Sequence, residues 1–195
     1  MIILDDAINI DTQEEIKKIF LSDEFPWFYK PENTFTVEGS NTPCLSHFFV
    51  IRGAINSTYS GILNLLITDC YKKIPDKVIK KFSHMVYARS FLQFPLHSNF
   101  CKTTVDALHV DYDLEHYVLL YYVMDSDGDT IITDTIYNKD KEISLKLEDH
   151  KEVHRIQPKQ GRIVLFDGSY YHTAEQPTNN VRCVINIDLV KPKPV

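Results

Sequence analysis

The sequence predicts a mainly β fold with packed helices, closed most simply as a double-stranded β-helix, the jelly roll. Three observations lead to this prediction. Helical periodicity is confined to the first part of the chain, apolar side chains alternate with a period of two from about residue 84, and eight such runs follow at nearly regular spacing. We therefore expect one domain over residues 1–195, with a helical part at about 1–83 and a jelly-roll core at about 84–190.

Two helices are expected in the first part. Residues 11–20, DTQEEIKKIF, place Asp11 as an N-cap with a glutamate three residues later, which is the pattern of a capping box. A second helix fits residues 57–74, STYSGILNLLITDCYKKI, with a serine or threonine as its cap and a proline just beyond its end.

The strands of the core are predicted from alternation and from the turn-forming residues between them. The expected strands are 84–94, 106–111, 116–124, 130–137, 142–147, 152–156, 161–167 and 181–189. Among the connections, DSDGD at 125–129 is typical of a tight hairpin turn. In the last strand Arg182, Val184, Asn186 and Asp188 alternate with apolar residues. A polar face on a strand this apolar indicates that it lines a cavity.

Composition and charge narrow the class of protein. The chain has 44% hydrophobic and 25% charged residues, as in an ordinary globular protein, and its net charge of −6 argues against an extended nucleic-acid-binding surface. No run approaches the roughly 18 consecutive apolar residues of a membrane span. The first residues, MIILDDAINID, lack the basic start of a signal peptide, and the four cysteines are isolated. We expect a cytoplasmic protein with reduced thiols and no membrane partner.

One set of side chains predicts a metal centre. His109 and Asp111 are two residues apart on an expected strand, so both side chains point to the same face. A third ligand must come from a distant strand, and His172 follows an apolar strand and a turn at Gly168. Two histidines and one carboxylate leave one face of a metal open, as in non-heme Fe(II) oxygenases, whereas zinc usually takes a different complement of ligands. His116, nearby, is expected at the rim of the pocket.

Arg182 is the candidate anchor for an organic acid bound to such a metal. It lies ten residues after His172, and the intervening EQPTNN is expected to form a hairpin that sets the two segments side by side. Arginine is suited to bidentate recognition of a carboxylate.

With these residues in view, residues 84–190 resemble the 2-oxoglutarate- and Fe(II)-dependent dioxygenases. The segments LLYYVMDSDGDT and PKQGRIVLFDGSYYHTAEQP are most similar to the prolyl-hydroxylase-like branch. The resemblance implies Fe(II) on His109, Asp111 and His172. It also implies 2-oxoglutarate bound by Arg182, with Tyr122 and Asn186 as further cosubstrate contacts. Many prolyl hydroxylases have lysine where this chain has Arg182, so the branch does not identify the substrate.

We therefore expect an enzyme that uses Fe(II), 2-oxoglutarate and O₂ to hydroxylate an unidentified substrate, with decarboxylation of 2-oxoglutarate to succinate. The prime substrate would be a protein residue or a small molecule. The alternative is a non-catalytic jelly-roll binding or structural module. The combination of Arg182 with the complete metal triad favours the enzyme, because a non-catalytic module has no need of both.

Overall fold

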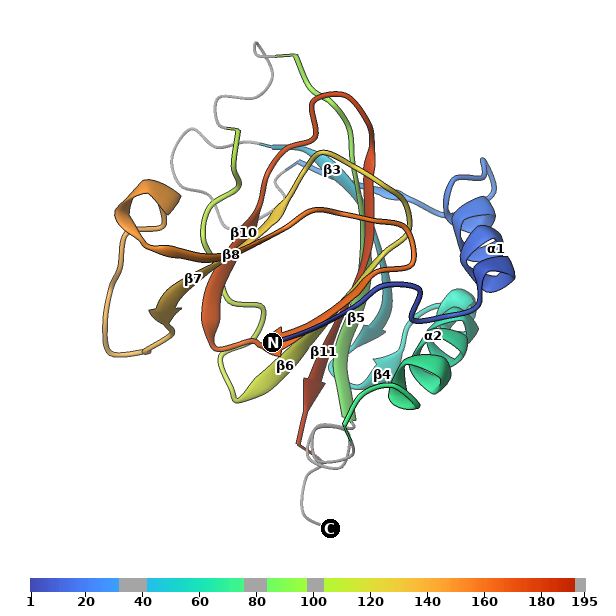
Figure 1. The fold of residues 1–195 in the computed structure, drawn as a ribbon, viewed down its shortest axis with the longest axis horizontal. Helices are drawn as coiled ribbons and strands as arrows, with labels where there is room; N and C mark the ends of the chain where they lie inside the picture. Colours follow the sequence, from blue (N-terminus) through green and yellow to red (C-terminus); the bar gives the residue numbers. More distant parts are fainter. Residues whose placement is uncertain (32–41, 76–83, 98–103, 192–195) are drawn as a thin grey trace.

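The computed structural model of the chain describes residues 1–31, 42–75, 84–97 and 104–191 (Figure 1). The strands are β1 (Ile2–Leu4), β2 (Phe28–Lys30), β3 (Cys44–Ile51), β4 (Ala54–Ile55), β5 (His84–Gln93), β6 (His116–Tyr122), β7 (Thr130–Ile136), β8 (Glu152–Ile156), β9 (Ile163–Asp167), β10 (Tyr170–Ala174) and β11 (Arg182–Val190). The helices are α1 (Ile10–Phe20) and α2 (Gly61–Tyr71), with short 3₁₀ turns at Thr58–Ser60 and Leu147–Asp149.

The described strands form two antiparallel sheets. The larger runs in the order β1-β9-β6-β11-β5-β3-β2, with β4 paired to β3, and the smaller in the order β10-β7-β8. Figure 1 shows β7, β8 and β10 on one side and the large sheet facing them, with α1 and α2 on the far side of the large sheet. The predicted class, mainly β with packed helices in a jelly roll, is confirmed.

Alternation along the central strands separates two apolar clusters. On β6, Val118, Leu120 and Tyr122 pack between the sheets, while Leu119 and Tyr121 face the helices. The inner cluster is completed by residues of the small sheet, and the outer cluster by the buried faces of α1 and α2. Burial on both faces explains why this strand reads as a continuous apolar run.

Both predicted helices are present, with different starts. The side chain of Asn9, and not that of Asp11, caps α1 by accepting a hydrogen bond from the Asp11 backbone N–H. Ser57 caps the 3₁₀ turn that leads into α2, as its sequence indicates. Asn9 and Asp11 are both residue types that cap helices well. The helix begins at Ile10, so Asn9 occupies the capping position.

The prediction that residues 1–83 are helical was wrong in part. Four strands lie in residues 1–31 and 42–75, and β3 pairs with β5 over most of its length in the large sheet. The segment CLSHFFVI is rich in aromatic and β-branched residues, but its buried Ser46 and His47 interrupt the alternation that identifies a strand.

Three predictions in the core also need correction. Residues 142–147 alternate but have no strand partner among the described residues, and residues 106–111 form only one isolated bridge, at His109–His172. Conversely, β10 is a strand that the sequence did not predict, because its aromatic and polar residues do not alternate. Pairing, which depends on tertiary structure, decided each case.

The two segments expected to form hairpins, DSDGD and EQPTNN, instead form crossovers that connect one sheet to the other. DSDGD connects β6 of the large sheet to β7 of the small sheet, and EQPTNN connects β10 to β11, which pairs with β5 and β6 and not with β10. The two crossovers contact one another, because Asp127 accepts hydrogen bonds from the backbone N–H groups of Thr178 and Asn179. His172 and Arg182 therefore face each other across the sheets and do not lie side by side.

Within the described ranges, no helix is long and apolar enough to cross a membrane. Cys44, Cys70 and Cys183 are buried free thiols, as expected, and Cys101 lies outside the described residues.

Candidate metal and cosubstrate site

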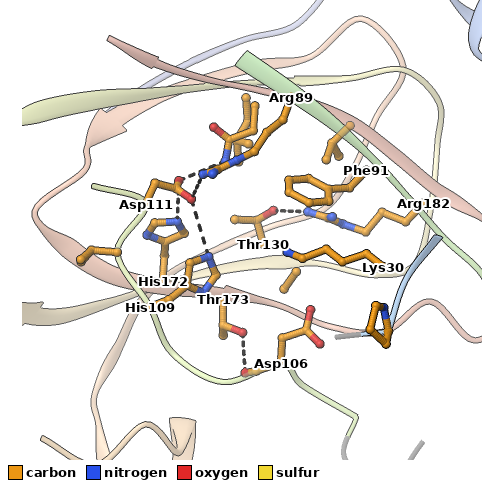
Figure 2. Close-up of a pocket in the computed structure, with 16 residues that line it drawn as sticks. Lys30, Arg89, Phe91, Asp106, His109, Asp111, Thr130, His172, Thr173 and Arg182 are labelled. Carbon is orange, nitrogen blue, oxygen red and sulfur yellow. Dashed lines mark hydrogen bonds and ion pairs between the residues drawn. The ribbon is translucent and has the colours of Figure 1, made fainter. Parts of the chain in front are cut away.

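A cavity of about 480 Å³ opens between the two sheets. Its wall is formed by both sheets and by the segment before β6. The lining residues are Lys30, Pro31, Arg89, Phe91, Asp106, His109, Val110, Asp111, Leu120, Thr130, His172, Thr173, Ala174, Arg182, Val184 and Asn186. The predicted polar face of β11 thus borders a cavity through Arg182, Val184 and Asn186. Figure 2 shows Asp111 and the two histidines on one side of it and Arg182 on the other.

The three predicted metal ligands come together. His109, Asp111 and His172 each offer one ligand atom within 4.8 Å of the others. The two histidines are fixed by a bridge in which each backbone N–H donates to the other's carbonyl, at 3.0 Å in both directions. This bridge joins the segment before β6 to β10, which is how residues 63 positions apart in the chain meet.

Both imidazoles present the same nitrogen to the site. Nδ1 of His109 lies 3.1 Å from the carbonyl oxygen of Ala107, and Nδ1 of His172 lies 3.1 Å from that of Tyr170. A ring nitrogen that is hydrogen-bonded to a carbonyl oxygen carries the proton. Nε2 of each ring therefore keeps its lone pair and is the atom available to bind a metal. Burial lowers the pKa of His109 to about 4, which keeps that ring neutral at neutral pH.

Both carboxylate oxygens of Asp111 accept hydrogen bonds from neighbouring side chains. Oδ1 accepts a hydrogen bond from Arg89, while Oδ2 accepts one from Asn186 Nδ2 at 3.0 Å and lies 3.2 Å from Nε2 of His172. Burial would raise the pKa of Asp111, but the charge of Arg89 and the contact with His172 hold it well below its usual range. Asp111 is therefore an anion facing two histidines, a donor set that suits a divalent transition-metal ion.

Behind Asp111, Arg89 also contacts the buried carboxylate of Asp188, with Nη2 3.3 Å from Oδ2. Burial raises the pKa of Asp188 to about 8, and the negative charge of Asp111 adds to the effect. Asp188 lies on the inner face of β11, where the alternation predicted it, but behind the cavity wall.

Arg182 is only 4% exposed and is held by neutral acceptors. Its guanidinium donates to the Gly128 carbonyl at 2.9 Å, to Gln93 Oε1 at 2.7 Å and to Thr130 Oγ1 at 2.9 Å. Burial lowers its pKa. No carboxylate in the described part of the chain forms an ion pair with it, so a buried cation faces the cavity without an anionic partner.

Tyr122 and Asn186 differ in their relation to the cavity. The hydroxyl of Tyr122 donates to Thr130 Oγ1 at 2.7 Å, so the cavity-lining group here is Thr130. Asn186 lines the cavity, donates to Asp111 and has a buried Oδ1 with no partner among the described residues. Direct contact of either residue with a cosubstrate stays a prediction. His116, expected at the rim, is instead fully buried against Gly168.

The sequence prediction missed several residues of the site. Arg89, Thr130 and Lys30 all line the cavity, and the Lys30 ammonium lies 5.5 Å from the centre of the Phe91 ring. A sequence signal for Arg89 was available, because it is a charged residue in the middle of a mostly apolar strand. No sequence pattern indicated Lys30, because β2 is three residues long and too short to show alternation.

Comparisons with solved structures identify the fold. An oxidoreductase of the 2OG-Fe(II) oxygenase family from Burkholderia pseudomallei aligns over 100% of this chain and 86% of its own, with a TM-score of 0.68 and 10% identity. A prolyl-4-hydroxylase from Pseudomonas putida aligns over 98% and 92%, with a TM-score of 0.61 and 10% identity. The epimerase SnoN, solved with Fe³⁺, alpha-ketoglutarate and nogalamycin RO, aligns over 97% and 78%, with a TM-score of 0.63 and 8% identity.

No protein-family model matches the sequence, and no curated protein matches it by sequence. The chain thus has the fold of the 2-oxoglutarate- and Fe(II)-dependent oxygenases, including those of the prolyl-hydroxylase type, which confirms the resemblance at the level of the fold. Its own residues supply a His-Asp-His triad inside that fold.

Proposed function

We propose that the protein is an Fe(II)- and 2-oxoglutarate-dependent dioxygenase that hydroxylates its substrate and converts 2-oxoglutarate to succinate. One observation carries the proposal. A His-Asp-His triad and a buried arginine with no ion-pair partner in the described residues border the same cavity. An isolated buried charge is costly, so an arginine kept in this state favours an anionic ligand.

The metal would be held by Nε2 of His109, Nε2 of His172 and the carboxylate of Asp111. These three donors fit Fe(II), because two neutral imidazoles and one carboxylate occupy only part of its coordination sphere. A bound Fe(II) ion would supply O₂ activation and a site for the keto acid. The chain fixes each imidazole through its Nδ1 hydrogen bond and holds the carboxylate ionised.

The distal carboxylate of 2-oxoglutarate would bind at Arg182. Nη1 and Nη2 of this residue each use one hydrogen on a protein acceptor and keep a second for a ligand. Thr130 Oγ1 accepts from both Arg182 and Tyr122, so its own hydrogen is available as a donor to the cavity. The neighbouring Val184 and Leu120 make this part of the wall apolar, which strengthens a charge-assisted pair.

The prime substrate would occupy the rest of the cavity, as a small molecule or as one residue of a protein. Similarity to the solved structures does not select between these, since prolyl hydroxylases and an epimerase share the fold. The cytoplasmic location expected from the sequence is part of the proposal.

Anaerobic titration tests the proposal directly. Adding 2-oxoglutarate to the Fe(II)-loaded protein is expected to produce a weak visible charge-transfer band, and admitting O₂ is expected to yield succinate. His172→Ala should abolish both while leaving the thermal unfolding midpoint nearly unchanged. His154→Ala, an exposed histidine on β8, is the matched control and should behave as wild type.

The outcomes separate the two candidate functions. A band and succinate formation that persist in His172→Ala would remove the metal assignment. Wild-type protein that binds neither Fe(II) nor 2-oxoglutarate would favour the non-catalytic jelly-roll module.

A further inference from the structure

Arg89 connects a metal ligand to the interior of the large sheet. It lies on β5, where its register partner on β11 is Asn186 and its partner on β3 is Phe48. Its Nη2 donates to Asp111 Oδ1 and lies 3.3 Å from Asp188 Oδ2. The side chains of the two aspartates are 4% and 0% exposed, so one guanidinium contacts two buried carboxyl groups, of which Asp111 is the ionised one.

The three ligands are held in different ways. The backbone bridge fixes both histidines. Asp111 follows that bridge in a segment without regular structure, before β6 begins. Its carboxylate therefore depends on side-chain contacts for its position, and those contacts come from Arg89 and Asn186, on the paired strands β5 and β11.

We propose that Arg89 is a positioning residue for the metal centre, which holds Asp111 through Oδ1 and leaves Oδ2 to ligate the ion. This inference rests on the proposed function. The contacts support this assignment, because Arg89 donates to Oδ1 whereas Oδ2 lies 3.2 Å from Nε2 of His172. A carboxylate that binds through one oxygen leaves more of the metal's open face to the keto acid and O₂. Asp188 supports Arg89 from behind.

A purely electrostatic role for Arg89 predicts the opposite result. If the guanidinium only repelled a cation, or competed with it for Asp111, removing Arg89 would tighten metal binding. If Arg89 positions Asp111, removing it weakens metal binding although a positive charge is lost. The sign of the change therefore distinguishes the two roles.

The experiment measures the affinity of the apoprotein for Mn²⁺ by electron paramagnetic resonance, in which free Mn²⁺ is counted directly. Arg89→Met is expected to weaken binding about tenfold or more, the usual range when a partner of a metal ligand is removed. Arg89→Lys keeps the charge but is shorter by one bond, so it should weaken binding severalfold. Arg162→Met is the control, since Arg162 is also partly buried and paired with an aspartate, Asp5, outside the cavity.

Each result decides between the alternatives. Mn²⁺ affinity in folded Arg89→Met that equals or exceeds that of wild type overturns the inference. If Arg89→Met does not fold, Arg89→Lys decides, and unchanged affinity there overturns it as well. Wild-type protein that binds no Mn²⁺ removes the proposed function together with this inference, whereas wild-type binding with unchanged Arg89 variants removes only the role of Arg89.

Discussion

Two arginines border the same cavity in opposite electrostatic situations. Arg89 contacts two carboxylates, and although burial lowers its pKa, the charges of Asp111 and Asp188 outweigh burial and raise it. Arg182 contacts a backbone carbonyl, an amide and a hydroxyl, and burial lowers its pKa. The first is neutralised by the protein, and the second is available to neutralise a ligand. This difference is why we assign a structural task to Arg89 and a binding task to Arg182.

Arg182→Ala should weaken 2-oxoglutarate binding by roughly 30-fold or more. Leaving one member of a buried charge pair without its partner costs roughly 2 to 5 kcal/mol, and each 1.4 kcal/mol is about tenfold in affinity. Arg182→Lys should recover only part of the loss, because lysine keeps the charge without the planar fork. The measurement is an anaerobic 2-oxoglutarate titration of the Fe(II)-loaded variants, with Mn²⁺ affinity as the control that should change little. Unchanged 2-oxoglutarate affinity in the alanine variant would contradict the assignment.

At the scale of elements, the turn between β9 and β10 leads into the strand that carries His172, and it depends on one glycine. The backbone N–H of Gly168 donates to the His116 carbonyl at 3.0 Å. A Cβ at this position would lie 2.1 Å from Nε2 of His116, a side chain that is fully buried. The close approach of β6 to this turn therefore requires glycine.

Gly168→Ala should destabilise the protein by about 1 to 3 kcal/mol, the usual cost of overpacking a close-packed interior. Gly61→Ala is the matched control, because nothing lies within 4 Å of its Cβ position and it begins α2. Urea unfolding of the two variants checks the prediction. Equal stability of both would show that His116 moves without cost.

Asp127 ties the two crossovers together, and it does so as an anion. Desolvation would raise its pKa, but hydrogen bonds from Thr178 and Asn179 outweigh it and lower the pKa from 3.8 to about 2. A carboxyl group with a lowered pKa in the folded state stabilises the fold above pH 3.8, and this contribution is lost as the pH falls through about 2.

Asp127→Asn should therefore be less stable than wild type at pH 6, and the difference should shrink between pH 4 and pH 2. Thermal unfolding across this range measures it, with Asp134→Asn, an exposed carboxylate on β7, as the control. A difference that stays constant with pH would mean that the charge of Asp127 contributes nothing to the turn.

At the scale of the whole molecule, the first part of the chain completes the core. Strand β3 pairs with β5, and α1 and α2 cover the outer face of the large sheet, where Phe20, Leu66 and Leu119 belong to one apolar cluster. We therefore expect residues 1–195 to behave as one domain with a single unfolding transition.

Leu66→Ala should lower the free energy of unfolding by about 2 to 5 kcal/mol, because it removes a fully buried side chain from this cluster. Leu65→Ala, at an exposed position on the same helix, should cost much less. Calorimetry of both variants provides the measurement. A separate early transition in Leu66→Ala would indicate that the helices unfold independently of the sheet.

The sequence alone determined the class of fold, the six strands β5, β6, β7, β8, β9 and β11, and the three residues of the candidate metal site. These features follow from local information, since alternation marks a half-buried strand and His109, Asp111 and His172 are ligand types at strand ends. The alternation of Arg182, Val184 and Asn186 even indicated which face of β11 would line a cavity. Local patterns were sufficient for these strands because alternation is set by residues adjacent in the chain.

Only the tertiary structure decided which segments pair and what surrounds each site residue. Residues 142–147 alternate but have no partner strand in the part of the chain that the structure describes, whereas β3 has one despite its irregular pattern. The crossovers place His172 and Arg182 on opposite sheets, and the contacts of Arg89 join residues 22 and 99 positions apart. Strand pairing and buried charge are satisfied by groups distant in the chain, so no local pattern in the sequence contains them.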